Sequence, residues 1–299
     1  MGQLCCKKRE SLYPEYSMAP SNEREISAQK YHSSNDIFFE DLETKYNIIS
    51  YIQLVEYMNL LENYTLETAT IPFEGEMKTQ FSSKDPFLTY VMSVDEFQSF
   101  IENKLLKLTE LYELSEKNEL MITTFKTAFR EIYTSLEVKL NQHYNEKVND
   151  RITKKTLIPL GVIFSISNVV GKIKLIFDLF KNDEGKFTKS NEFNDYLLTS
   201  FLICSYCMIS ARRKITTTNP NIPEMSKEDL IKCLGVCELK DCQNLVHVFN
   251  NTFFEKESYN WMEFKEKFHN KEKGFQWILT SKGIRRNLEE HNVQNFFKV

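Results

Sequence analysis

The stretch KLIFDLFKNDEGKFTKSNEF, residues 174–193, decides the fold that we expect for this chain. It begins with apolar residues at helical spacing, which give way to a short polar segment containing Asp183 and Gly185. Phe187 lies near the centre of that segment, and Glu192 stands at the start of a second apolar run. This order of residues predicts a helix, a loop and a second helix.

Three other stretches fit the same twelve-residue loop, in which oxygen ligands occupy positions 1, 3, 5, 7, 9 and 12 and a glycine makes the turn at position 6. They are residues 85–96, 145–156 and 252–263. Position 8, which is apolar in such loops, is taken in these three stretches by Met92, Ile152 and Tyr259.

The loop of the first stretch can be counted in two ways. Counting back from Glu192 as position 12 puts Lys181 at position 1. Moving the frame by one residue puts Gly185 at position 6 and Phe187 at position 8, but Asn191 then takes the place of the terminal carboxylate. Neither frame holds every expected ligand.

The two middle loops, which start at residues 145 and 181, are 36 residues apart and are joined by TLIPLGVIFSISNVVGKIKLIFDLF. This spacing and the apolar link resemble the second and third hands of the neuronal calcium sensor and calcineurin B-like families of the EF-hand superfamily. The resemblance is best over residues 130–210 and fair over 225–270. Spacings of 60 and 71 residues on either side of the middle pair exceed the family norm.

The resemblance and the composition together predict an all-α fold. Only 8 Gly and 7 Pro leave too few turn-forming residues for a many-stranded sandwich or barrel. We expect a flexible N-terminal membrane anchor and tether over residues 1–34, followed by a two-lobed array of EF-hand-like helix–loop–helix units. The N-terminal lobe is expected over 35–165, and the C-terminal lobe with a terminal helix over 166–299.

Amphipathic periodicity predicts the individual helices of these lobes. The expected helical ranges are 48–61, 120–140, 157–180, 192–210, 227–234, 243–254 and 261–268. Residues 214–224, with three threonines and two prolines, are expected to form an interior loop. The amphipathic residues 274–299 are expected either to dock on the molecule or to contact a partner.

The chain opens with MGQLCCKKRE, which predicts membrane attachment by acylation. Once Met1 is removed, Gly2 is available for myristoylation and Cys5 and Cys6 for palmitoylation, although Cys6 stands where the usual motif has Ser or Thr. One myristoyl chain holds only marginally, so a second chain or the basic cluster that follows makes attachment durable. We therefore expect localisation at the cytoplasmic face of a membrane.

Calcium ligands are only partly present in the four loops. Lysines occupy several ligand positions, including Lys147, Lys181 and Lys256, and lost carboxylates lower calcium affinity steeply. The candidate ligands for weakly bound calcium are Asn145, Asn149, Thr153, Asp183 and Glu192. No cofactor is otherwise expected.

Other functions are less well supported by the sequence. A net charge of −4 gives no basic field for nucleic acid, and no HExxH, phosphate-loop or GxSxG motif indicates an enzyme. The 16 residues 196–211 are too short to span a membrane and predict a buried helix. Within them, Cys204 and Cys207 form a CxxC, but we expect reduced core cysteines rather than a zinc site.

The sequence therefore predicts a membrane-tethered adaptor that binds a protein partner, with the partner contributing an amphipathic helix. Two alternatives remain open at this point. One is a weak calcium sensor of the calcineurin B-like type, and the other is a structural component of a cytoskeletal or ciliary assembly.

Overall fold

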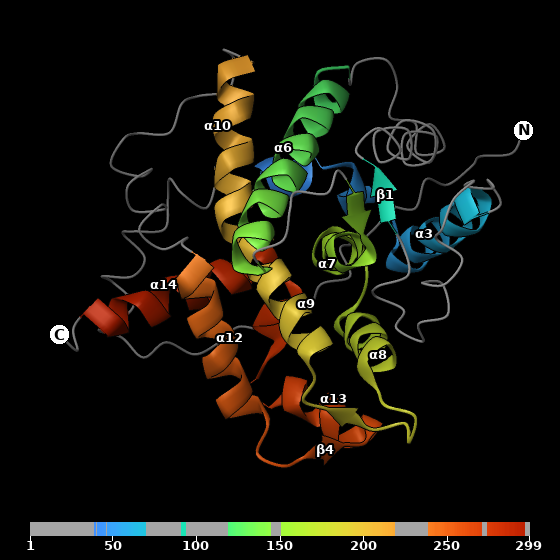
Figure 1. The fold of residues 1–299 in the computed structure, drawn as a ribbon, viewed down its shortest axis with the longest axis vertical. Helices are drawn as coiled ribbons and strands as arrows, with labels where there is room; N and C mark the ends of the chain where they lie inside the picture. Colours follow the sequence, from blue (N-terminus) through green and yellow to red (C-terminus); the bar gives the residue numbers. More distant parts are fainter. Residues whose placement is uncertain are drawn as a thin grey trace, which may run out of the picture.

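The computed structural model describes residues 39, 41–45, 47–69, 91–93, 119–144, 151–218, 239–270 and 274–296, and this part of the chain is mostly helical (Figure 1). The helices and strands are η1 (Asp41–Lys45), η2 (Ile48–Tyr51), α3 (Leu54–Ala69), β1 (Val91–Ser93), α6 (Glu119–Tyr144), β2 (Arg151–Thr153), α7 (Lys154–Phe164), α8 (Val169–Phe180), β3 (Phe187–Thr188), α9 (Asn191–Leu202), η6 (Ile203–Cys207), α10 (Met208–Thr218), α12 (Leu239–Phe253), β4 (Ser258–Tyr259), α13 (Trp261–His269), η7 (Gln276–Leu279) and α14 (Ser281–Phe296). The predicted helical class is confirmed for these residues, which also hold four short strands, while the two-lobed EF-hand-like arrangement stays a prediction.

Two short antiparallel ladders join segments that are far apart in the chain. β1 pairs with β2, and β3 pairs with β4. Each ladder lies beside helices that follow the strands: α7 begins directly after β2, and α13 begins one residue after β4. The two ladders therefore join loops to one another and do not form a sheet at the core of the fold.

The units α8–β3–α9 and α12–β4–α13 pack against one another as a pair. α9 contacts α12, α8 contacts α13, and the two strands pair between them. Side-chain oxygens cap the first turns of three of these helices: Asn168 accepts from Gly171, Ser190 from Phe193 and Asn260 from Glu263. Such caps satisfy backbone N–H groups that have no partner within the helix.

The apolar run expected as one helix over 157–180 is in fact two helices. α7 ends at Phe164 and α8 begins at Val169. Between them Ile166 takes part in a backbone bridge, since its N–H donates to Ile52 O at 2.8 Å and its carbonyl accepts from Leu54 N at 2.9 Å. This long-range pairing interrupts the helix, and local periodicity does not reveal it.

α9, η6 and α10 follow one another without a break, and α10 lies along α6 (Figure 1). The expected loop at 214–224 is therefore wrong for residues 214–218, which complete α10. Threonine hydroxyls bond to carbonyls of the preceding turn, with Thr217 Oγ1 at 2.7 Å and Thr218 Oγ1 at 3.1 Å from Lys214 O. These bonds accommodate a threonine run in a helical turn, despite its low helix propensity.

The buried apolar side chains of the described residues form one cluster, which runs from Phe39 to Leu288. The C-terminal helix α14 belongs to it, because Ile284 and Leu288 are buried and α14 packs against α12, η6 and η7. Of the two roles expected for residues 274–299, docking on the molecule is the one observed for 274–296. The boundary between residues 35–165 and 166–299 stays a prediction.

Among the helices that the structure describes, none combines the length and the apolar character that crossing a bilayer requires.

Candidate functional site

The two ladders bring together the residues that the sequence placed at position 8 of the four loops. Met92 lies opposite Ile152 in the first ladder, and Phe187 lies opposite Tyr259 in the second. The second pairing matches position 8 to position 8 only in the frame that has Gly185 at position 6. In the other frame Thr188 takes position 8, and it lies opposite Ser258.

Gly185 makes the turn of the third loop with a φ of 73°, a conformation that glycine adopts without steric cost. The side chain of Asn182 organises the same turn, since its Oδ1 accepts from Glu184 N at 3.1 Å and from Lys186 N at 2.9 Å. The backbone closes it, with Asn182 N donating to Lys186 O at 2.8 Å. The loop therefore has its shape from its own hydrogen bonds.

Lysines neutralise two of the acidic side chains around this loop. Lys181 Nζ lies 2.9 Å from Asp178 Oδ1, and Lys186 Nζ lies 3.3 Å from Glu184 Oε2. Partial burial opposes ionisation of Asp178, but hydrogen bonds from Lys181 and Lys174 hold its pKa below the ordinary value. The ammonium groups of Lys181 and Lys186 thus balance the negative charges of the Asp178 and Glu184 carboxylates.

The predicted ligands Asp183 and Glu192 are both exposed, the first in the loop and the second in the first turn of α9. Phe193, not Glu192, donates its backbone N–H to the cap residue Ser190, and its side chain is buried. Within the described ranges, no three His, Cys, Asp or Glu side chains gather where a metal ion could be held.

The remaining predicted residues are only partly described. Thr153 ends β2, with no description of its side chain. The candidate ligands Asn145 and Asn149 and the acylation residues Gly2, Cys5 and Cys6 lie outside the described residues.

The fourth loop, residues 252–263, is closed by an ion pair and a capping box. Lys256 Nζ pairs with Glu263 Oε1, while Glu263 Oε2 accepts from Asn260 N at 2.9 Å. Asn260 Oδ1 in turn accepts from Glu263 N at 3.1 Å. The hydrogen bond from Lys256 and the backbone bond from Asn260 hold the pKa of Glu263 below its ordinary value.

Tyr259 lies at the centre of this loop, and its ring is flanked by two ammonium groups. Lys256 Nζ is 5.0 Å and Lys267 Nζ is 5.5 Å from the ring centroid. The buried phenol donates to Phe253 O at 2.8 Å and accepts from Glu255 N at 2.9 Å. The Tyr259 side chain therefore contacts the end of α12, the loop backbone and both lysines.

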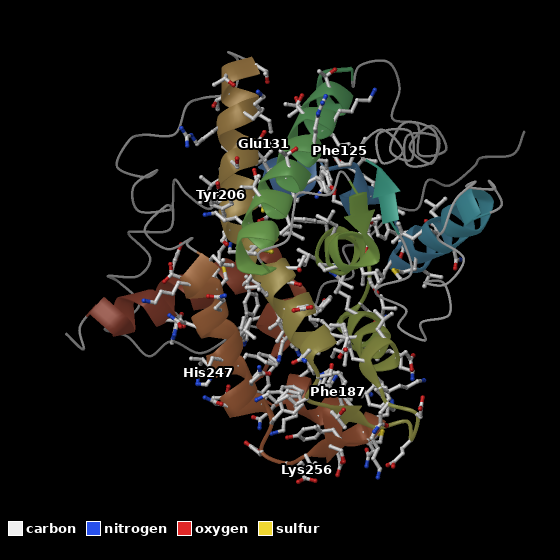
Figure 2. All side chains as sticks on the ribbon, viewed as in Figure 1. Phe125, Glu131, Phe187, Tyr206, His247 and Lys256 are labelled. Carbon is white, nitrogen blue, oxygen red and sulfur yellow. The ribbon has the colours of Figure 1, made fainter. Side chains whose placement is uncertain are left out.

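A pocket of about 540 Å³ opens beside this loop. It is lined by Thr252, Glu255, Lys256, Tyr259, Glu263, Glu266, Lys267, Asn270 and Phe275. Figure 2 shows Lys256 at this end of the molecule, near the aromatic side chains around Phe187. The lining contains both lysines and glutamates, and two ion pairs lie within it, Lys256–Glu263 and Lys267–Glu255.

Aromatic rings fill the space between the two paired loops. Phe187 lies 4.3 Å from Phe264 and 4.9 Å from Phe193, measured between ring centroids. Phe253 lies 5.7 Å from Phe264 and 5.6 Å from Tyr259. This interlocking cluster holds the loops in register, since aromatic pairs at such distances add to burial.

The expected core role of the CxxC is confirmed. Cys204 and Cys207 are reduced thiols fully buried in η6, and Cys242 of α12 is also a buried, reduced thiol. Burial raises the pKa of the Cys204 thiol to about 12, against a smaller opposing effect of a hydrogen bond with Ser281.

Sequence reasoning placed Lys256 and Glu263 in one loop but missed that they pair. Their opposite charges and their spacing along the chain were visible in the sequence, but contact depends on how tightly the loop turns around Tyr259.

Comparison with protein-family models, with curated proteins and with solved structures finds no match for this chain.

Proposed function

We propose that this protein is a membrane-tethered, EF-hand-like adaptor that binds a protein partner and does not depend on calcium. The pairing of Met92 with Ile152 and of Phe187 with Tyr259 is the observation that carries the proposal. In EF-hand-like units two loops pair at their eighth positions. The frames of the first, second and fourth loops give this match directly, and the third loop gives it in the frame that has Gly185 at position 6.

The packing of the helices supports the same assignment. In the second pair, the helix before one loop contacts the helix after the other: α8 contacts α13, and α12 contacts α9. α7, which begins directly after the first ladder, contacts α3, and Tyr57 of α3 donates to Leu157 O of α7 at 2.9 Å. This reciprocal arrangement allows each unit to bury its apolar face against its neighbour.

The charges in the two described loops support independence from calcium. Calcium needs several hard oxygen ligands, and a sensor opens when the terminal glutamate is drawn toward the ion. Here Lys256 already pairs with Glu263, and Asn191 takes the terminal position of the third loop in the frame that matches the ladder. In neither of these described loops do three acidic side chains gather where they could hold calcium.

The membrane tether is proposed from the sequence MGQLCC alone. Expression in a eukaryotic cell tests it: intact protein should carry a myristoyl mass on Gly2 and thioester-labile acylation on Cys5 or Cys6. Gly2→Ala should move the protein to the soluble fraction, since three basic residues are too few to hold it. Full retention of Gly2→Ala on membranes contradicts the tether.

Calcium independence is tested by calorimetric titration together with an apolar reporter dye. Millimolar calcium, compared with magnesium, should change neither helical content nor dye binding. A several-fold rise in dye binding at micromolar calcium would replace the adaptor proposal with the sensor alternative. Asp183→Ala and Asn145→Ala would then identify the responsible loop.

Partner binding is tested by cross-linking the acylated protein in cells and identifying what is captured reproducibly. A partner segment that forms an amphipathic helix and binds equally with calcium or chelator supports the proposal. Binding only in the presence of calcium contradicts it. Co-sedimentation with microtubules distinguishes the cytoskeletal alternative.

A further inference from the structure

Glu263 uses both of its carboxylate oxygens within its own loop. Oε1 pairs with the ammonium of Lys256, and Oε2 accepts the backbone N–H of Asn260 at 2.9 Å. Glu263 is the last residue of the loop frame 252–263. In a metal-binding EF-hand the glutamate at this position gives both oxygens to the ion.

Lys256 stands at position 5 of the same frame, where a metal-binding loop supplies a ligand. Its ammonium reaches Glu263 and lies 5.0 Å from the centroid of the Tyr259 ring. The ammonium of Lys256 at position 5 thus pairs with the carboxylate of Glu263 at position 12. The same ammonium lies near the ring of Tyr259 at position 8. A bound metal ion would make the same link between the loop and the helix that follows it.

We propose that the Lys256 ammonium is the built-in cation of the fourth loop, replacing a metal ion between the loop and the start of α13. The proposal rests on the EF-hand-like assignment made above and deepens it. It explains how the fourth loop and the first turn of α13 stay linked without calcium.

The surroundings of Lys256 make the proposal testable by removing its charge. Lys256, Tyr259 and Glu263 all line the 540 Å³ pocket, and the Lys256 and Glu263 side chains are 45% and 41% exposed. If Lys256 is truncated, solvent can reach the carboxylate that it leaves behind. No metal ion takes its place, because Glu263 is then the one carboxylate at a ligand position of the frame 252–263.

The experiment measures amide hydrogen exchange of Asn260, Glu263 and Phe264 in the full chain. Lys256→Ala should accelerate exchange about two- to fivefold, in keeping with an exposed ion pair. Lys256→Arg should resemble wild type because it keeps the positive charge. Calcium at about 5 mM should change exchange in neither the wild type nor Lys256→Ala, since one carboxylate at the ligand positions is too few for calcium.

Lys189→Ala is the matched control, because Lys189 is an exposed lysine of the other described loop. It should leave these three amides unchanged. Unchanged exchange in Lys256→Ala, or exchange in Lys256→Arg as fast as in Lys256→Ala, overturns the built-in cation while leaving the adaptor proposal standing. Slower exchange of the wild type in calcium overturns the calcium independence in the adaptor proposal as well.

Discussion

The ring of Tyr57 in α3 lies against the α-carbon of Gly161 in α7, in the space that a Cβ atom at residue 161 would occupy. The Tyr57 hydroxyl donates to Leu157 O one turn earlier in the same helix, at 2.9 Å. α3 and α7 therefore approach closely because residue 161 has no side chain.

We expect Gly161→Ala to lower the free energy of unfolding by about 1–3 kcal/mol, because the new methyl overlaps a buried ring. Urea denaturation measures the change. Gly171→Ala is the control: its Cβ would meet chiefly the Ser167 hydroxyl, which can rotate away, and alanine favours the helix. Equal stability of the two variants would contradict close packing of Tyr57 on α7.

Lys172 is buried in α8, where its ammonium lies 3.2 Å from Ile163 O and 3.4 Å from Leu279 O. Burial lowers its pKa to about 8, partly offset by Cys204. Above pH 8 the unfolded chain therefore binds more protons at this lysine than the folded chain does, so its contribution to stability rises with pH.

The difference in unfolding free energy between wild type and Lys172→Met should consequently grow in favour of wild type by about 1 kcal/mol from pH 8 to pH 9. Denaturant titrations at half-unit steps from pH 6.5 to 9 measure it. Lys174→Met, an exposed position on the same helix, should follow the wild-type slope. A constant difference between wild type and Lys172→Met would contradict the lowered pKa.

Arg285 of α14 joins the C-terminal helix to the N-terminal segment. Its guanidinium pairs with Glu43 and lies 4.4 Å from the centroid of the Phe39 ring. The two charged side chains are 11% and 16% exposed, so solvent screens them less than a surface pair.

A double-mutant cycle with Glu43→Gln and Arg285→Met should give a coupling energy of about 1–3 kcal/mol. The exposed pair Lys174–Asp178 should give less than about 1 kcal/mol in a parallel cycle. Coupling at Glu43 and Arg285 no larger than in this reference pair would show that α14 is not fastened to the N-terminal segment through these charges.

The thiols of Cys204, Cys207 and Cys242 should resist alkylation in the native protein, because all three are buried and thiolate is the reactive form. Burial raises the pKa of both Cys204 and Cys242 to about 12. Peptide mapping after iodoacetamide treatment should find them modified only in denaturant. Rapid native labelling of these peptides would contradict the core packing of η6 and α12.

The sequence by itself determined the helical class and the positions of several loops. Helical periodicity located α6, α12 and α13 within a few residues, and the loop frames selected Met92, Ile152 and Tyr259 as ladder residues, with Phe187 selected by one of two frames. These features depend on spacing along a short segment, and that spacing is written in the chain. The frame of the third loop stayed ambiguous because its glycine and its glutamate favoured different counts.

Only the tertiary structure decided which loops pair and how their charges are used. The bridge at Ile166 divides the expected helix 157–180, and Lys256 neutralises Glu263 across a tight turn. Arg285 and Glu43 lie 242 residues apart in the chain yet meet in space. Such contacts arise when separate elements bury their apolar faces together, and no local pattern of residues encodes them.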